Sequence, residues 1–215
     1  MIRAVNRRMT WLTAIAIAIL LMVATAALAA DKGDGPLALV QQTAGKMIDA
    51  IKKDRAAINK DKNHLFDLVE QIVLPHFDFE RMSKLVLGKY WNRATDEQRR
   101  EFTAEFRFLL VRTYATAMLE YTDQKITYEP LRAEPGATEV VVQTEVDQAG
   151  GFPVPIDYKM FKNDRGQWKV YEVVIDGVGL VINYRSSFAT EIRGKGGIDG
   201  LIKTLKGRNA EARNE

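Results

Sequence analysis

The chain changes its apolar periodicity twice, and this change limits the possible folds more than any other feature of the sequence. Up to residue 122, apolar residues recur every three or four positions, as they do on one face of a helix. From residue 124 to residue 175 they alternate, as in strands with one buried face, and the helical spacing then returns. Helices, then strands with short connections, then helices again predict an α+β domain built around an antiparallel meander.

The helical segments carry clear start and stop signals. The longest is predicted between residues 94 and 122, where Thr95 and Gln98 form a capping box and an apolar stripe continues over roughly seven turns. A shorter helix is predicted between Asp78, as its N-cap, and Gly88, as a left-handed C-terminal stop. Further helices are predicted over residues 36–51, 64–74, 179–194 and 197–207, and the polar tail 208–215 is expected to fray.

Four strands are predicted in "KITYEPLR", "TEVVVQTEV", "FPVPIDYKMF" and "QWKVYEVVI", joined by turns at "EPGA", "DQAGG" and "NDRG". The second strand alternates apolar and polar residues, which is typical of a sheet with one buried face. The last strand is apolar on both faces and ends at Asp176-Gly177. Asp176 is interpreted as a turn residue or an N-cap in preference to a catalytic acid.

The N-terminus has the zones of a secretory signal peptide. Arg3, Arg7 and Arg8 precede an uncharged run, which ends in the small residues Ala27-Leu28-Ala29. We expect cleavage after Ala29, which leaves residues 30–215 as a single domain. The run is also long enough for an uncleaved membrane anchor, which is the alternative.

Charge and cysteine content narrow the class of protein. The whole chain has 31 Lys and Arg against 28 Asp and Glu, and the leader contains three Arg and no acid. The mature domain is therefore nearly neutral, which argues against a nucleic-acid binder. An exported chain without Cys has no disulfides and must rely on its core, which suits a bacterial periplasm.

The sequence contains few residues arranged for metal binding or catalysis. His64 and His76 are the only histidines and neither has the spacing of a metal site, so no metal is expected. No serine lies in a nucleophile motif, and no enzyme activity is predicted. What remains is an excess of apolar residues on the strands and on the long helix. Periodicity alone favours an ordinary core over a ligand cavity.

Three longer stretches resemble a known family. "LVLGKYWNRATDEQRREFTAEFRFLLVRTYATAM", "WKVYEVVIDGVGLVINYRSSF" and "KGGIDGLIKTLK" are similar to the MlaC, or toluene-tolerance, family of periplasmic phospholipid-binding proteins. The acid-Gly-Val turn of that family usually continues with Ser, whereas this chain has Gly179. The resemblance implies an NTF2-like α+β fold, with a curved four-stranded antiparallel sheet and several helices enclosing an apolar cavity.

The same resemblance implies a function. The implied protein is a non-enzymatic carrier that has no cofactor and binds phospholipid as its ligand. Such a carrier moves lipid between an outer-membrane lipoprotein–porin complex and an inner-membrane ABC transporter complex, and so maintains outer-membrane lipid asymmetry. A hopanoid-type lipid carrier and an envelope adaptor without a ligand remain alternatives.

The predicted lipid contacts come from the inward faces of the long helix, the strands and the following helix. They are Phe106, Leu109, Leu110, Tyr114, Met118, Val140, Val142, Ile156, Tyr158, Met160, Val173, Ile175 and Val181.

Overall fold

The computed structural model describes residues 35–115, 118–119, 124–148, 151–194 and 196–213. The predicted signal peptide, its cleavage site and the end of the predicted long helix lie outside these ranges. Within them, no helix combines the length and the apolar character needed to cross a bilayer.

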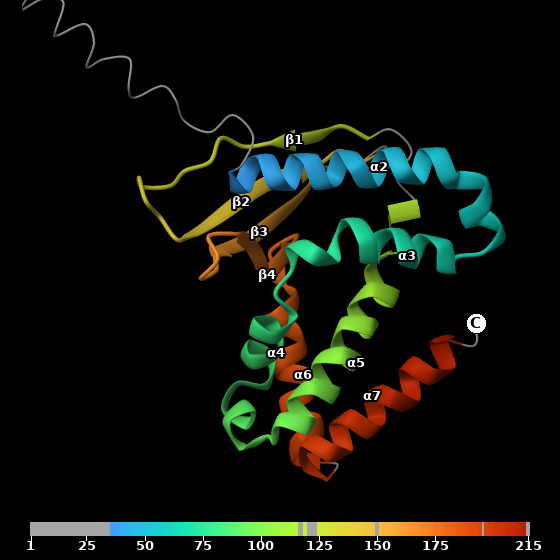
Figure 1. Ribbon diagram of the computed structural model, residues 1–215, viewed down its shortest axis with the longest axis vertical. Coiled ribbons are helices and arrows are strands. Elements are labelled where there is room, and N and C mark those ends of the chain that lie inside the picture. The colour runs from blue at the N-terminus through green and yellow to red at the C-terminus, as the bar shows by residue number, and fades with distance from the viewer. Residues whose placement is uncertain (1–34, 116–117, 120–123, 149–150, 195, 214–215) are drawn as a thin grey trace, which may run out of the picture. The chain divides into compact units, whose positions relative to one another are not determined.

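Helices occupy both ends of the described chain and strands its middle (Figure 1), as the change of periodicity predicts. The first helix is longer than predicted and is kinked at Asp54, which has non-helical backbone angles. The helices are α2 (Pro36–Lys60), α3 (Asn63–Ile72), α4 (Phe79–Leu87), α5 (Asp96–Ala115), α6 (Leu180–Gly194) and α7 (Gly197–Arg213), with short 3-10 helices η1 (Leu74–His76) and η2 (Gly88–Arg93) on either side of α4.

The predicted helix signals are confirmed. The Asp78 side chain accepts a hydrogen bond of 2.8 Å from the backbone N–H of Arg81, so it caps α4. Gly88 follows the last residue of α4 with a φ of 54°, a value that glycine adopts at little cost. The Gln98 N–H donates to the Thr95 hydroxyl, and the Thr95 N–H donates to the Gln98 side chain, which completes the capping box of α5.

The strands form one antiparallel sheet in chain order, as a meander should. The sheet has a fifth strand that was not predicted, a two-residue strand paired with the end of β4. A bulge between β3 and β4 leaves Tyr171 without a partner, because Lys159 pairs with Glu172 and Met160 with Val170. The strands are β1 (Ile126–Tyr128), β2 (Glu139–Val146), β3 (Val154–Lys162), β4 (Trp168–Ile175) and β5 (Val178–Gly179).

The predicted corner at Asp176-Gly177 is a tight turn between β4 and β5. Both residues have positive φ, 49° and 76°, as the type I′ turn of a two-residue hairpin requires. The turn interpretation of Asp176 is therefore confirmed, but its role as a helix cap is wrong. The acid at the start of α6 is Glu172 of β4, whose side chain accepts a 2.9 Å hydrogen bond from the N–H of Val181.

The C-terminal tail was expected to fray, and this expectation is wrong over most of its length. Helix α7 continues to Arg213. Its residue Asn209 is only 2% exposed, and the side-chain amide donates to the backbone carbonyl of Glu105 at 2.9 Å and to the Glu105 carboxylate at 2.6 Å. A polar residue that bonds to α5 therefore holds the last turns of α7 in place.

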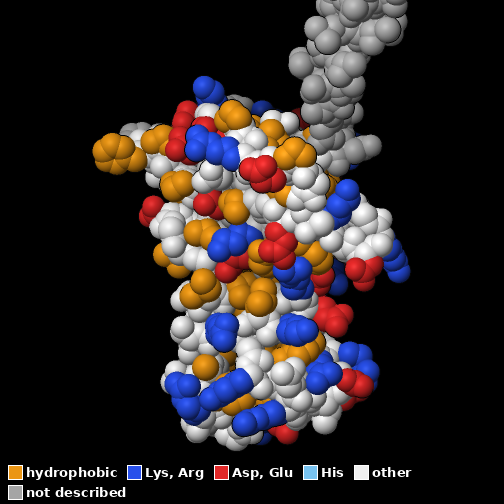
Figure 2. Space-filling view, turned by 90° about the vertical axis from the view of Figure 1, so that its left-hand side faces the viewer, with side chains coloured by type: hydrophobic (Ala, Val, Ile, Leu, Met, Phe, Trp, Pro, Cys, Tyr) orange, Lys and Arg blue, Asp and Glu red, His pale blue; other side chains and the backbone are white. Residues whose placement is uncertain are grey.

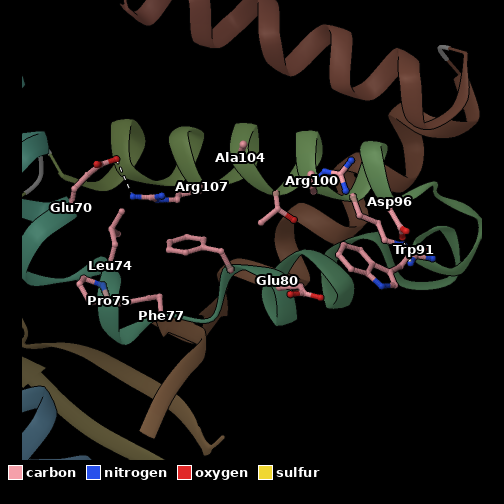
Figure 3. A pocket seen from close by; sticks show the side chains of 13 residues that line it. Glu70, Leu74, Pro75, Phe77, Glu80, Trp91, Asp96, Arg100, Ala104 and Arg107 are labelled. Carbon is pink, nitrogen blue, oxygen red and sulfur yellow. Dashed lines mark hydrogen bonds and ion pairs between the residues drawn. The ribbon is translucent and has the colours of Figure 1, made fainter. Parts of the chain in front are cut away.

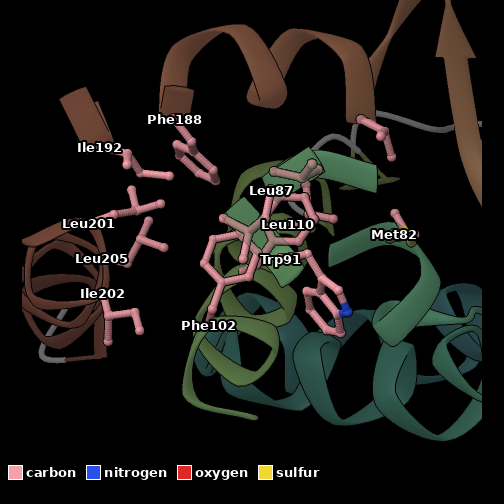
Figure 4. Packing of buried hydrophobic residues seen from close by; sticks show 13 residues of the cluster. Met82, Leu87, Trp91, Phe102, Leu110, Phe188, Ile192, Leu201, Ile202 and Leu205 are labelled. Carbon is pink, nitrogen blue, oxygen red and sulfur yellow. The ribbon is translucent and has the colours of Figure 1, made fainter. Parts of the chain in front are cut away.

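The buried apolar residues form three clusters. We name the first the helical cluster: it joins residues of α4, α5, α6 and α7 and contains Phe102, Phe106 and Phe188 (Figure 4). The second, the sheet cluster, joins one face of the sheet to Val40 of α2. The third joins α2 and α3 to the C-terminal end of α5 through Val111 and Ala115. The sheet therefore packs against α2 on the face that the sequence predicts to be buried.

Candidate functional site

The predicted contacts on the strands share one face of the sheet. On β2 the alternation is as predicted, with Val140 and Val142 buried and Val141 exposed. Val142 lies opposite Tyr158 on β3, and Tyr158 lies opposite Val173 on β4. The seven predicted residues that belong to this surface are Val140, Val142, Ile156, Tyr158, Met160, Val173 and Ile175.

Two polar side chains on this face are turned to local partners. The Thr144 hydroxyl donates a 3.0 Å hydrogen bond to the carbonyl oxygen of Ile156 on the neighbouring strand. Burial raises the pKa of Tyr158 to about 12, with a smaller contribution from Tyr128. The phenol is therefore neutral over the physiological range, and the surface carries no charge there.

Five of the six predicted contacts on the helices belong to the helical cluster. Phe106, Leu110 and Val181 are buried in it, while Leu109 and Tyr114 are partly buried against it. The Phe106 ring packs edge-on against Tyr184 of α6, with 5.3 Å between the ring centroids. Burial raises the pKa of Tyr114 to about 12, and the neighbouring Tyr184 adds to this increase.

The two surfaces meet at two places in the chain. Phe77, between η1 and α4, packs against both the helical and the sheet cluster. At the start of α6, Leu180 packs against the sheet cluster and its neighbour Val181 lies in the helical cluster. Met118 is separate from both, because it packs against the third cluster. The structure thus brings most of the predicted residues to two adjoining apolar surfaces, and it leaves Met118 apart.

A groove of about 840 Å³ lies between α5 and the segment from η1 to η2 (Figure 3). Its apolar lining includes Phe77, Phe79 and Trp91, and charged side chains from both walls surround it. The charges are largely compensated, since Arg107 pairs with Glu70 at 3.1 Å. The full lining is Glu70, Leu74, Pro75, Phe77, Phe79, Glu80, Trp91, Asp96, Arg99, Arg100, Thr103, Ala104 and Arg107.

None of the predicted contacts lines this groove, so the sequence interpretation missed it. The signal was present in the aromatic residues of "PHFDF" and "KYW", and in the arginines that recur along one side of the long helix. Phe77 is the residue that links the groove to the two apolar surfaces.

The ionisable groups near these surfaces serve local structure. Burial lowers the pKa of His76, and Lys169 and Lys46 lower it further, so the neutral ring is favoured. His64 bonds to Asp54 at 2.9 Å, beside the kink of α2. Glu172 accepts hydrogen bonds from the N–H groups of Val173 and Val181. In the described ranges, no group of three or more His, Cys, Asp or Glu side chains gathers in a way that could hold a metal ion.

Comparison with known proteins gives consistent results. The family model described as "MlaC protein" matches residues 41–207. The "Intermembrane phospholipid transport system binding protein MlaC" of Haemophilus influenzae is 32% identical over 173 residues, which are 80% of each chain. The "Toluene tolerance protein ttg2D" of Pseudomonas putida is 30% identical over 173 residues, which cover 80% of this chain and 79% of that protein.

A solved structure supports the same relationship. It is that of a phospholipid-binding protein from Ralstonia solanacearum in complex with a phospholipid. It superimposes with a TM-score of 0.75 at 36% identity, and the match covers 81% of this chain and 96% of the other.

Proposed function

Because the chain belongs to the MlaC family, we propose that it is a non-enzymatic carrier that binds phospholipid acyl chains and transports the lipid through the periplasm. The observation that supports this most directly is the similarity to a protein whose structure contains a phospholipid, over nearly the whole of that protein. The described part of the chain also contains two large clusters of buried apolar side chains that adjoin each other, and acyl chains need such an apolar environment.

The physical task explains why apolar surface is the main requirement. Each buried methylene group is worth about 0.8 kcal/mol, so one sixteen-carbon chain opposes transfer through water by roughly 12 kcal/mol. A carrier lowers this barrier by offering an apolar environment of similar quality, and it needs no reactive group to do so. Side chains such as Met160, Tyr114 and Phe77 suit this role, because methionine and aromatic groups adapt to mobile chains.

The site that we propose is the junction between the sheet cluster and the helical cluster. Acyl chains there would contact Val173 and Ile175 on the sheet side and Leu110 and Val181 on the helix side. Phe77 would lie between the two surfaces, since it packs against both. The phospholipid head group would stay near solvent. This assignment predicts that lipid binding responds to changes on either surface, and that Met118 matters less.

The predicted signal peptide, and the nearly neutral charge that its removal would leave, support a periplasmic carrier that exchanges its cargo with membrane complexes. An inner-membrane ABC transporter complex and an outer-membrane lipoprotein–porin complex are the partners that we propose. In that system the carrier would help to maintain outer-membrane lipid asymmetry. No nucleotide-binding motif is seen in the sequence, so any energy input would come from a partner.

The test is to purify the mature chain without detergent and to identify bound lipid by native mass spectrometry. We expect stoichiometric phospholipid. A hopanoid in its place would support the alternative carrier, and protein that repeatedly emerges without lipid would support an adaptor with a solid core.

A matched pair of variants locates the site. Ile175→Glu places a charge on the apolar face of the sheet, at a partly buried position, and should lower the lipid content. Val141→Glu places the same charge on the opposite face, where Val141 is 41% exposed, and should leave the lipid content unchanged. Circular dichroism and the urea midpoint show whether each variant is folded. Equal lipid loads in two folded variants would remove the sheet face from the site.

A further inference from the structure

One surface of the protein carries basic side chains that have no carboxylate partner. It is formed by α4, η2 and α6. The segments 79–93 and 180–194 contain six Lys and Arg but only two Asp and Glu, although the mature chain as a whole is nearly neutral. In Figure 2, Lys and Arg side chains predominate over Asp and Glu in the lower half, where these elements lie. We call the exposed residues Lys84, Lys89, Arg93 and Arg185 the basic face.

Lys84, Lys89 and Arg185 come from elements that meet near Gly88, and Arg93 is the last residue of η2. Helices α4 and α6 pack side by side. The Arg185 guanidinium lies against Gly88, where a Cβ atom would be only 3.1 Å from its Nη2. Lys84 lies one turn before Gly88, and the Lys84 carbonyl accepts the Gly88 N–H. Glycine at position 88 therefore lets an arginine of α6 come close to the end of α4.

These cations have no carboxylate partner in the described part of the chain, although the Lys89 ammonium lies over the Tyr90 ring, 5.3 Å from its centroid. All four residues are exposed. Within the described part of the chain, neither Lys84 nor Arg93 nor Arg185 forms a hydrogen bond or ion pair through its side chain. The end of a helix favours nearby cations, which accounts for where Arg185 lies. In this position the N–H donors of the Arg185 guanidinium remain available for an external acceptor.

Two exposed apolar side chains lie on α6 and on the strand just before it. Ile182 is 63% exposed and lies one turn before Arg185 on α6, so the two share a side of that helix. Val178, just before α6, is 56% exposed. Basic side chains beside exposed aliphatic ones suit the interface of a bilayer, where cations meet phosphate and aliphatic groups enter the head-group region. Hot spots of protein interfaces are enriched in Trp, Tyr and Arg and poor in Val, whereas the apolar groups beside these cations are aliphatic.

We propose that the basic face, together with Ile182 and Val178, docks the protein on a bilayer that contains anionic phospholipid. This goes beyond the proposed function, which has the carrier exchange lipid with protein complexes and assigns it no contact with a bilayer. Docking would be weak and reversible, since few residues take part. It would bring the carrier to the membrane surface before a specific partner is engaged.

Flotation with vesicles tests the proposal. The full mature protein is mixed with vesicles of phosphatidylcholine alone, or of phosphatidylcholine with phosphatidylglycerol, and the fraction that floats is measured. We expect binding only when phosphatidylglycerol is present, and loss of binding at about 1 M salt, where charges are screened beyond about 3 Å. Failure to float with either vesicle, or equal binding to both, would overturn the proposal and leave an acidic protein as the kind of partner to seek.

Variants assign the binding to this face. Each basic residue near an anionic surface contributes about fivefold to binding, so Lys84→Gln with Arg185→Gln should weaken it roughly 25-fold. The control is Lys162→Gln with Arg165→Gln, which removes two exposed cations from the hairpin between β3 and β4. Ile182→Ser should also weaken binding, whereas Val141→Ser should not. Equal binding by the test and control pairs would refute the assignment.

The lipid content of each variant is measured separately by mass spectrometry. A variant that keeps its bound phospholipid but no longer floats supports docking at this face. Wild-type protein that lacks bound lipid but floats with anionic vesicles would contradict the carrier function and leave the docking proposal standing. The two hypotheses can therefore fail independently.

Discussion

Glu172 should stabilise the protein by anchoring α6 to the sheet, although the sequence marks Asp176 as the more conspicuous acid. Glu172 is 4% exposed, and one of its carboxylate oxygens accepts hydrogen bonds from the N–H groups of Val173 at 3.1 Å and of Val181 at 2.9 Å. The second of these groups lies in the first turn of α6, where N–H groups lack partners within the helix and negative charge is favoured. A strand thus supplies the cap of the helix that follows it.

The expected destabilisation can be estimated from these contacts. Glu172→Gln keeps the acceptor and the shape but loses the charge, which should cost about 1–2 kcal/mol. Glu172→Ala leaves two buried N–H groups without an acceptor, at about 1–3 kcal/mol each, so the total should be about 2–6 kcal/mol. With an m value of about 2 kcal/mol per M of urea, the unfolding midpoint should fall by roughly 0.5–1 M for Glu172→Gln and by roughly 1–3 M for Glu172→Ala.

Urea unfolding followed by circular dichroism measures both midpoints. The control is Glu145→Ala on the exposed side of β2, which should change stability by less than about 0.5 kcal/mol. A midpoint for Glu172→Ala within the range of that control would refute the anchoring role. So would a greater loss of stability in Glu172→Gln than in Glu172→Ala, because the amide retains the acceptor that the alanine lacks.

Two further predictions concern Gly179 and His76. A Cβ atom at Gly179 would lie 3.0 Å from the second carboxylate oxygen of Glu172. Gly179→Ser should lower the free energy of unfolding by less than about 1 kcal/mol, because its hydroxyl can donate to the carboxylate. Gly179→Val should lower it by about 1–3 kcal/mol, because the larger side chain crowds Glu172. Equal urea midpoints for the two variants would contradict this prediction. The pKa of His76 is lowered from 6.5 in the folded state, so the unfolded chain takes up a proton first as the pH falls. The stability that results is present above pH 6.5 and is lost as the pH falls below it. The free energy of unfolding of His76→Gln should therefore drop less than that of the wild type between about pH 7 and pH 5. A drop equal to that of the wild type would contradict the prediction.

The sequence predicts the order and type of the elements well, because their signals are local. The capping box at Thr95, the cap at Asp78 and the stop at Gly88 each depend on residues a few positions apart. The errors concern interactions between distant segments. The end of α7 was expected to fray because its composition is polar, whereas Asn209 bonds to Glu105, more than a hundred residues away.

The candidate site shows the same limit. Alternation along β2 correctly separates buried Val142 from exposed Val141, because a strand has two faces. It cannot say what covers the buried face, and in the structure Val40 of α2 contributes to that cover. The prediction therefore collected the helix and sheet residues into one set, whereas they form two adjoining clusters. Met118 was included because it continues the stripe of the long helix, yet it packs against a third cluster.

Apolar density alone cannot distinguish a core from a lipid-binding wall, because both gain free energy by removing apolar surface from water. The polar contacts at the edge of such a wall show how the elements on its two sides are attached to each other. Glu172 bonds to Val181 across the place where the sheet and helical clusters adjoin, and this bond fixes the start of α6 relative to β4. If acyl chains enter between the two surfaces, as we propose, this charge-assisted hydrogen bond would hold the start of α6 to β4 while the packing there changes.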